Sequence, residues 1–150
     1  MKEKSYTPEN YPILRYGDVL LMLAEAENEA HQGPTDLAYK CINEIRQRAG
    51  ISKLKGLSYT DFQQAVRDER ARELCFESLR KYDLVRWGIY VEAVHDKLGA
   101  ATQDKRWATG NQFIGARDYA ARTQEKHQFL PIPTKELDVN GKLEQNKYWQ

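Results

Sequence analysis

The sequence has no apolar run close to the roughly 18 residues that a membrane-spanning helix needs, and no signal-peptide core follows its first five residues. Taken alone, the chain is expected to be soluble and cytoplasmic, but a missing leader carries no weight if the chain is a piece of a longer protein. The chain also lacks a charge excess, because 23 basic and 22 acidic residues leave a net charge of +1. Proteins that bind duplex nucleic acid gather basic residues on one face, so this balance argues against that class.

Cysteine is scarce as well, and its placement favours free thiols. Cys41 and Cys75 form no CxxC motif and have no histidine at metal-ligand spacing, so a zinc site is unsupported and a disulfide is not expected. One Glu-x-x-His motif joins Glu92 to His95, but di-iron bundles need that motif twice and two further glutamates. No metal site and no cofactor is predicted.

What the chain has in quantity is helical periodicity. With 150 residues, of which 41% are hydrophobic, it can bury one core and is expected to form a single domain, 1–150. A first helix is predicted from about Leu14 to His31, and Gly33 with the proline after it ends this helix. Its predicted apolar stripe consists of Tyr16, Val19, Leu20, Leu23, Ala24, Glu27 and Ala30.

A second helix is predicted to follow Thr35 as its N-cap and to stop at Gly50. Its stripe consists of Ala38, Cys41, Ile42, Ile45 and Ala49. Two helices of similar length joined by a short turn form an antiparallel hairpin, close in size to the roughly 34-residue tetratricopeptide repeat. One such repeat cannot bury its own face, so the hairpin must pack on a third helix or on helices outside this chain.

A long third helix is predicted from a capping box at Thr60 and Gln63 to about Tyr82. Its stripe holds the apolar residues Phe62, Val66, Phe76 and Trp87 and the ionisable residues Glu69, Glu73, Arg80 and Asp83. Burying a lone carboxylate is strongly unfavourable unless a cation and hydrogen-bond donors meet it. The sequence therefore predicts a partly buried structural charge network. Its members are Glu69, Glu73, Arg70, Arg80, Asp83, Arg86, Arg46 and Arg48.

A second interpretation of Glu69 and Glu73 is a general acid and base, since glycosidases use two carboxylates at such a separation. The structural interpretation is favoured because the neighbouring arginines would keep both carboxylates ionised, whereas a general acid needs a raised pKa. No catalytic residue is predicted on these grounds, and the chain is not expected to be an enzyme.

The rest of the chain is predicted to be less regular. A short helix at 89–98 leads into a long irregular loop region at 99–128. The run 129–133 is expected to be extended because its prolines keep it out of a helix interior. Thr134 then caps a short helix, and Asn140 with the glycine after it marks a turn.

Aromatic residues are the only ligand-binding candidates in the loop region. Trp107 and Tyr119 are tentative ligand-binding residues, because an exposed aromatic ring can stack on the apolar face of a sugar. The plainer interpretation, which is favoured, is that Trp107 and Phe113 pin the loop to the core.

A set of short motifs follows one order over about residues 13–148. They are Ile13-Leu14-Arg15-Tyr16, Asp18 to Met22, Ala24-Glu25-Ala26, Ile42 to Arg46, Arg48-Ala49-Gly50, Glu69-Arg70, Glu73-Leu74, Phe76-Glu77, Arg80, Asp83 to Gly88, Leu130 to Pro133, Glu136-Leu137 and Gln145-Asn146. With them the chain resembles the C-terminal part of the SusD/RagB family of glycan-capturing lipoproteins, found on the outer membrane of Bacteroidetes-type bacteria. The tail departs from the family only slightly, at Gly141 and Lys147.

The resemblance implies an all-α, tetratricopeptide-like scaffold: a helical hairpin, a long third helix, an irregular loop region and an extended C-terminal tail. It implies non-catalytic glycan binding at the cell surface, in partnership with a SusC-type TonB-dependent transporter, and membrane contact only through a lipid anchor that is not present in this chain. No ligand-contacting residue is carried over from the family. Two alternatives stay open, a tetratricopeptide-like scaffold for protein partners and a hydrolase using Glu69 and Glu73.

Overall fold

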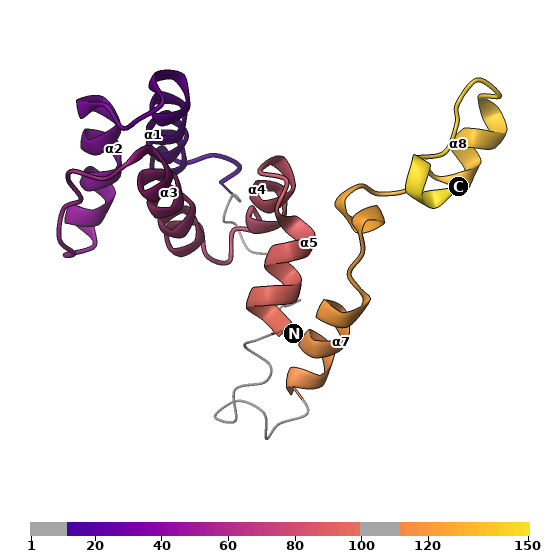
Figure 1. The fold of residues 1–150 in the computed structure, drawn as a ribbon. Coiled ribbons are helices and arrows are strands. Elements are labelled where there is room, and N and C mark those ends of the chain that lie inside the picture. The colour runs from indigo at the N-terminus through magenta and orange to yellow at the C-terminus, as the bar shows by residue number, and fades with distance from the viewer. Residues whose placement is uncertain (1–11, 100–111) are drawn as a thin grey trace, which may run out of the picture. The chain divides into compact units, whose positions relative to one another are not determined.

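The computed structural model describes residues 12–99 and 112–150, and this part of the chain contains helices and no strands. The chain divides into two compact units, Met1–Arg80 and Lys81–Gln150, which are described separately. Figure 1 shows the succession of helices along the chain. The all-α, tetratricopeptide-like fold is confirmed. In the described ranges, no helix is both long enough and apolar enough to cross a membrane.

The first unit begins with the expected helical hairpin, made of α1 (Tyr16–His31) and α2 (Asp36–Arg48). The last turn of α1 closes with Gln32 in the left-handed conformation, and the N–H groups of Gln32 and Gly33 both donate to the carbonyl of Asn28. The Thr35 hydroxyl oxygen then accepts a hydrogen bond of 3.1 Å from the backbone N–H of Ala38. The predicted N-cap of α2 is confirmed.

Helix α3 (Tyr59–Glu73) packs against the hairpin, but both of its ends differ from the prediction. Its N-cap is Ser58, whose hydroxyl accepts from the N–H of Asp61, and not Thr60. The helix stops at Glu73 and does not continue to Tyr82.

A contact that helical periodicity cannot show lies at this end of α3. Arg15, which precedes α1, donates a hydrogen bond to the carbonyl oxygen of Glu73, an acceptor that a continuing helix would use itself. The chain then turns through residues 74–78, and Phe76 and Ser78 adopt positive φ angles of 66° and 62°. The predicted place of Phe76 in a core stripe is wrong, since this residue is 99% exposed after the turn.

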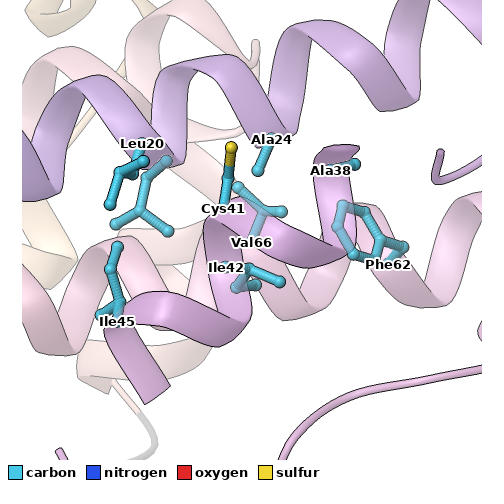
Figure 2. Packing of buried hydrophobic residues seen from close by; sticks show 9 residues of the cluster. Leu20, Ala24, Ala38, Cys41, Ile42, Ile45, Phe62 and Val66 are labelled. Carbon is cyan, nitrogen blue, oxygen red and sulfur yellow. The ribbon is translucent and has the colours of Figure 1, made fainter. Parts of the chain in front are cut away.

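The core of the first unit lies between α1, α2 and α3 (Figure 2). It consists of Leu20, Leu21, Ala24, Ala38, Cys41, Ile42, Ile45, Phe62 and Val66. Tyr39 adds an edge-to-face contact with Phe62, with ring centroids 5.0 Å apart. Full burial of a side chain such as Leu21 or Ile42 contributes about 1.5–3 kcal/mol. Cys41 is buried in this core and Cys75 is exposed, and both are free thiols, as predicted.

The buried face of α1 is only partly the predicted one. Leu20 and Ala24 are buried as expected, but Tyr16, Val19 and Leu23 of the predicted stripe are exposed. Helix α1 carries apolar residues on most of its circumference, and within this unit α2 and α3 cover one side of it. An apolar face of α1 therefore remains exposed, consistent with the general need of a single helical repeat for further neighbours.

The second unit continues the chain with short helices. They are α4 (Arg80–Arg86), α5 (Tyr90–Ala93), the π-helical turn η1 (Val94–Gly99), α7 (Gln112–Arg122), the 3₁₀ turn η2 (Glu125–Gln128), α8 (Thr134–Val139) and the 3₁₀ turn η3 (Lys147–Trp149). A small core of Leu84, Tyr90, Val94 and Ala120 joins α4, α5, η1 and α7. The helix predicted at 89–98 corresponds to α5 and η1. The prediction of an irregular region at 99–128 is wrong for 112–122, which form α7.

The C-terminal tail is held by side-chain amides. Gln145 accepts from the N–H of Ile132 and donates to the carbonyl of the same residue, each at 2.9 Å, as a neighbouring strand would. The Asn146 amide donates to the Leu130 carbonyl at 2.7 Å. The extended run that contains Pro131 and Pro133 thereby satisfies its backbone groups without a sheet.

Replacing Ser78 by glycine is expected to stabilise the first unit. A residue with a side chain in the left-handed region is strained by about 1–2 kcal/mol, and glycine is not. Because Ser78 is exposed and its φ is 62°, Ser78→Gly should raise the free energy of unfolding in urea by about 0.5–1 kcal/mol. Ser52→Gly is the matched control, because the φ of Ser52 is not positive, and this variant should be slightly less stable. Equal effects of both variants would contradict the argument.

Candidate functional site

The two carboxylates singled out by the sequence lie in the first unit, each between arginines. Glu69 on α3 is buried, and its Oε2 accepts from Arg46 Nη1 at 2.7 Å and from Arg72 Nη1 at 3.3 Å. Arg46 also donates from Nε to the carbonyl of Ser52 at 2.8 Å, which fixes the guanidinium between α2 and the loop that follows. Glu69 therefore joins the end of α2 to the middle of α3.

Glu73 is held by two arginines, one that precedes α1 and one at the end of α2. Its Oε1 lies 2.5 Å from Arg15 Nη1, and its Oε2 accepts from Arg48. Arg15 also donates from Nε to both carboxylate oxygens of Glu77 at 2.9 Å. These hydrogen bonds, that of Glu77 first, raise the pKa of Arg15 above its ordinary value. Gly17 is buried beside this cluster, and a Cβ there would lie 2.7 Å from Arg15 Nη1 and 2.8 Å from Glu73 Oε1, so a larger residue would require the flexible ends of these two side chains to shift.

One buried ion pair of the first unit was not predicted. Arg70 Nη1 lies 2.7 Å from Asp18 Oδ1, and the two side chains are 5% and 9% exposed. Only Arg70 was expected to belong to a network. Asp18 lies one turn before Leu21 on the buried side of α1, but it lies outside the apolar stripe predicted for this helix, so the test applied to Glu69 did not identify it.

The electrostatics of Glu73 argue against the acid–base interpretation. Burial raises the pKa of Glu73, but the hydrogen bonds from Arg15 and Arg48 outweigh burial and hold the pKa below its usual value. A general acid must carry a proton at working pH, and Glu73 is held ionised. The geometry of Glu69 and Glu73 is that of helix-to-helix ties, not of an acid–base pair around an open site.

The other residues of the expected network are distributed over both units. Arg80 donates to the carbonyl of Arg67 at 3.1 Å, within the first unit. Asp83 and Arg86 belong to the second unit, where Arg86 Nη2 lies 3.0 Å from Asp83 Oδ1. Placing them on the same long helix as Glu69 was wrong, because α3 ends at Glu73 and α4 begins at Arg80.

A cleft in the second unit is the candidate ligand site, and it is called here the tyrosine cleft. It has a volume of about 210 Å³. Its walls come from the start of α4, from α5, from α7, from η2 with the following extended run, and from η3. The chemically distinctive residues along it are Lys81, Tyr90, Tyr119, Arg122, His127 and Trp149.

Two tyrosine hydroxyls meet in the tyrosine cleft. Tyr90 is buried and its hydroxyl is hydrogen-bonded to that of Tyr119, whose side chain is about half exposed. Burial, followed by this hydrogen bond, raises the pKa of Tyr90 to about 12. The Tyr90 hydroxyl is therefore protonated at neutral pH. One proton lies between the two oxygens, and the accepting hydroxyl keeps its own proton for another acceptor.

The far wall of the tyrosine cleft is held by Trp149. Its indole N–H donates to the carbonyls of Lys126 and Phe129, at 3.0 and 3.1 Å, so the ring position is fixed by the backbone. His127 meets the indole edge-to-face, with ring centroids 5.9 Å apart. The Nδ1 atom of His127 accepts from the N–H of Gln124, which leaves Nε2 as the donor of the neutral ring.

Of the two tentative ligand-binding residues, the structure places Tyr119 in this cleft, while Trp107 lies outside the described residues. Phe113 is part of α7. Sequence reasoning missed Lys81, Tyr90, Arg122, His127 and Trp149, since they come from separate elements and share no local spacing. The histidine of the single Glu-x-x-His motif, His95, has Nε2 at 2.9 Å from the carbonyl of Thr123. In 12–99 and 112–150, no three potential metal ligands gather.

Comparison with known proteins identifies the family. The model of the SusD family matches residues 1–149. The chain belongs to the SusD family. It is 41% identical over 139 residues to SusD-like protein P25 of Formosa agariphila, an alignment that covers 90% of this chain and 23% of that protein.

Solved structures of SusD proteins agree with this assignment. A SusD homolog from Bacteroides thetaiotaomicron matches with a TM-score of 0.74 and 39% identity, over 89% of this chain and 26% of that one. A SusD superfamily protein from Bacteroides vulgatus matches with a TM-score of 0.66 and 30% identity, over 91% and 27%. The chain thus spans about a quarter of the length of these SusD relatives.

The ion pairs of Glu73 predict how the stability of this SusD-family chain depends on pH. A carboxylate whose pKa is lowered on folding stabilises the fold above its unfolded pKa, and this stability is lost as pH falls through the folded pKa. Glu73→Gln should therefore lower the free energy of unfolding by about 2 kcal/mol near pH 6. The difference from wild type should shrink as the pH falls from about 5 to 3, measured by urea unfolding at each pH. The control Glu44→Gln, which changes an exposed carboxylate of α2, should follow the wild-type curve at all these pH values.

The tyrosine pair predicts a second titration. Because folding raises the pKa of Tyr90, the associated stability is present below about pH 10 and is lost as pH rises through about 12. Tyr119→Phe removes the hydrogen bond and should lower the pKa of Tyr90, although burial still holds it above 10. The pKa is read from phenolate absorbance as the difference between each protein and its Tyr90→Phe derivative. Tyr82→Phe, which changes an exposed tyrosine of the same unit, should leave the value near 12.

Proposed function

We propose that this chain is the C-terminal domain, 1–150, of a non-catalytic glycan-binding protein that works at the bacterial cell surface. In this proposal the protein captures oligosaccharide at the outer membrane and delivers it to a SusC-type TonB-dependent transporter, with a lipid anchor outside this chain as its only membrane contact. Membership of the SusD family is the observation that carries the proposal, because proteins of this family are generally glycan-binding partners of SusC transporters.

The tyrosine cleft supports a binding role for this part of the protein. It combines an exposed aromatic ring, a hydroxyl with a proton to donate and cationic side chains, which are the groups that sugar rings and their hydroxyls require. The short elements that carry these groups share one small core, so the cleft has a defined shape before a ligand arrives.

The arrangement of carboxylates supports binding without catalysis. Glu69 and Glu73, the pair considered for hydrolysis, accept from the arginines that tie α1, α2 and α3 together. An inverting or retaining glycosidase needs one carboxyl group that stays protonated, and the lowered pKa of Glu73 works against that requirement. The proposed role therefore involves no bond cleavage by these residues.

A protein-interaction scaffold is the second candidate function. The observation in its favour is the exposed apolar face of α1, where Tyr16, Val19 and Leu23 are all solvent-accessible. Helical repeats commonly bind peptides or helices along such faces. This candidate predicts protein binding that is independent of the tyrosine cleft.

The proposal is tested by affinity electrophoresis of the chain in gels that contain soluble plant, algal or host polysaccharides. At least one polysaccharide should retard the wild-type protein, and Tyr119→Ala should abolish or strongly reduce the retardation. The control Tyr82→Ala, an exposed ring of the same unit outside the cleft, should migrate as the wild type does. Incubation with the retarding polysaccharide should release no new reducing ends.

The outcomes separate the candidate functions. Retardation lost only in Tyr119→Ala supports glycan binding through the cleft. Release of reducing ends that disappears in Glu69→Gln would make the chain a hydrolase. The absence of retardation by every polysaccharide, in protein shown by circular dichroism to be folded, would contradict glycan binding by this chain and favour the scaffold.

A further inference from the structure

The two cations along the tyrosine cleft, Lys81 and Arg122, differ from the arginines of the first unit because carboxylates neutralise them little. Lys81 has its ammonium 5.4 Å from the centroid of the Tyr90 ring, and no carboxylate of 12–99 or 112–150 lies within ion-pair distance of it. Arg122 lies 3.8 Å from Asp118, one turn earlier on α7, and its side chain is 82% exposed. An exposed pair at that distance contributes little, so Arg122 keeps most of its capacity for another anion.

The first unit shows what structural arginines look like in the same chain. Arg15 contacts the carboxylates of both Glu73 and Glu77, and Arg46 contacts Glu69 at 2.7 Å. In those positions each guanidinium is neutralised by a carboxylate from another helix. In the residues that the structure describes, neither Lys81 nor Arg122 joins two helices through a carboxylate. Lys81 lies over the Tyr90 ring, and Arg122 lies near Asp118 of its own helix.

The remaining lining of the tyrosine cleft adds no negative charge. In the part of the chain that the structure describes, its lining contains no aspartate or glutamate. Tyr90 stays protonated at neutral pH, and the hydroxyl groups of Tyr90 and Tyr119 can donate hydrogen bonds. The ring nitrogen of His127 that is not bound to Gln124 is a further N–H donor. The lining therefore offers two positive charges and several donors, which matches an anion in both charge and hydrogen bonding.

The size and shape of the tyrosine cleft favour a single sugar unit. Sites for drug-sized ligands have volumes of about 300–1,000 Å³, and this cleft, at about 210 Å³, is smaller. The half-exposed ring of Tyr119 supplies a flat apolar surface beside the cations. A neutral sugar on that surface would displace water from Lys81 and Arg122 without offering a negative charge in its place. This loss of hydration weakens the binding of a neutral sugar.

We propose that the tyrosine cleft is a subsite for one acidic sugar unit, whose ring lies against Tyr119 and whose carboxylate or sulfate group is bound by Lys81 and Arg122. This inference rests on the proposed glycan-binding function and narrows it to anionic glycans. The two chemical sources of negative charge, uronic acids and sulfate esters, present similar oxygen acceptors and are distinguished by experiment.

The test is isothermal titration calorimetry of the 150-residue chain with matched oligosaccharides. The first pair is a galacturonic acid trisaccharide and its neutral methyl ester, and the second is a sulfated galactose oligosaccharide and its desulfated form. The anionic member of at least one pair should bind more tightly than its neutral partner, and its affinity should fall as NaCl rises from about 50 to 300 mM. The pair that shows the difference identifies carboxylate or sulfate as the recognised group.

Variants locate the effect in the cleft. Lys81→Gln and Arg122→Gln should each weaken binding of the anionic oligosaccharide about fivefold, as expected for the loss of one partly exposed charge contact, while the neutral partner is affected little. Lys81→Arg keeps the charge and should retain most of the affinity. Lys135→Gln, which removes an exposed cation of α8 outside the cleft, is the matched control and should bind as the wild type does.

Each other result overturns the inference in a recognisable way. Equal affinity for the charged and neutral members, lost in Tyr119→Ala, would leave glycan binding in the cleft correct and its acidic preference wrong. Binding of an anionic glycan that is unchanged in Lys81→Gln and Arg122→Gln would place the site elsewhere in the chain. If none of the four oligosaccharides binds but a neutral polysaccharide still retards the chain in the gel, glycan binding stands and the acidic subsite is wrong. If no oligosaccharide and no polysaccharide binds, the proposed glycan-binding function itself fails.

Discussion

The guanidinium of Arg15 is the group on which the first unit depends. It precedes α1, yet its donors reach the carboxylates of Glu73 and Glu77 and the last carbonyl of α3. One side chain thus joins the first helix to the third, satisfies an orphan acceptor at a helix C-terminus and places positive charge where the helix dipole favours it. Gly17 leaves room for this contact, because a Cβ there would lie within 3 Å of both partners and the two side-chain ends would have to shift.

The same chain uses cations in two ways, and the difference is visible in their partners. In the first unit, arginines meet carboxylates from other helices and are partly or fully removed from water, which holds α1, α2 and α3 in one arrangement. Along the tyrosine cleft, Lys81 and Arg122 stay exposed with weak contacts. A cation that is paired with a carboxylate stabilises the fold. A cation that has only weak contacts and lies beside aromatic rings is available to a ligand.

The helical repeat also explains what the fold leaves open. A hairpin plus one helix buries Leu21, Ile42 and Phe62 completely but covers only one side of α1. The exposed apolar residues of α1 agree with a family in which this chain spans about a quarter of the length of its relatives. Stability in such repeats comes from nearest neighbours, so each helix face is informative about the packing around it.

The sequence by itself determined the helical class, the hairpin with its Thr35 cap and the family, because these depend on local periodicity and ordered short motifs. It also determined the buried stripe of α2 except for Ala49, which follows the helix and is exposed. Only the tertiary structure decided where α3 ends, and it shows that Arg15, from a position 58 residues away, donates to the carbonyl of Glu73 at that end. It also decided which elements form the tyrosine cleft. Tyr119 was a candidate from its residue type, but Lys81 and Trp149 come from distant positions that only the packing of the second unit brings together, and no local pattern records such a contact.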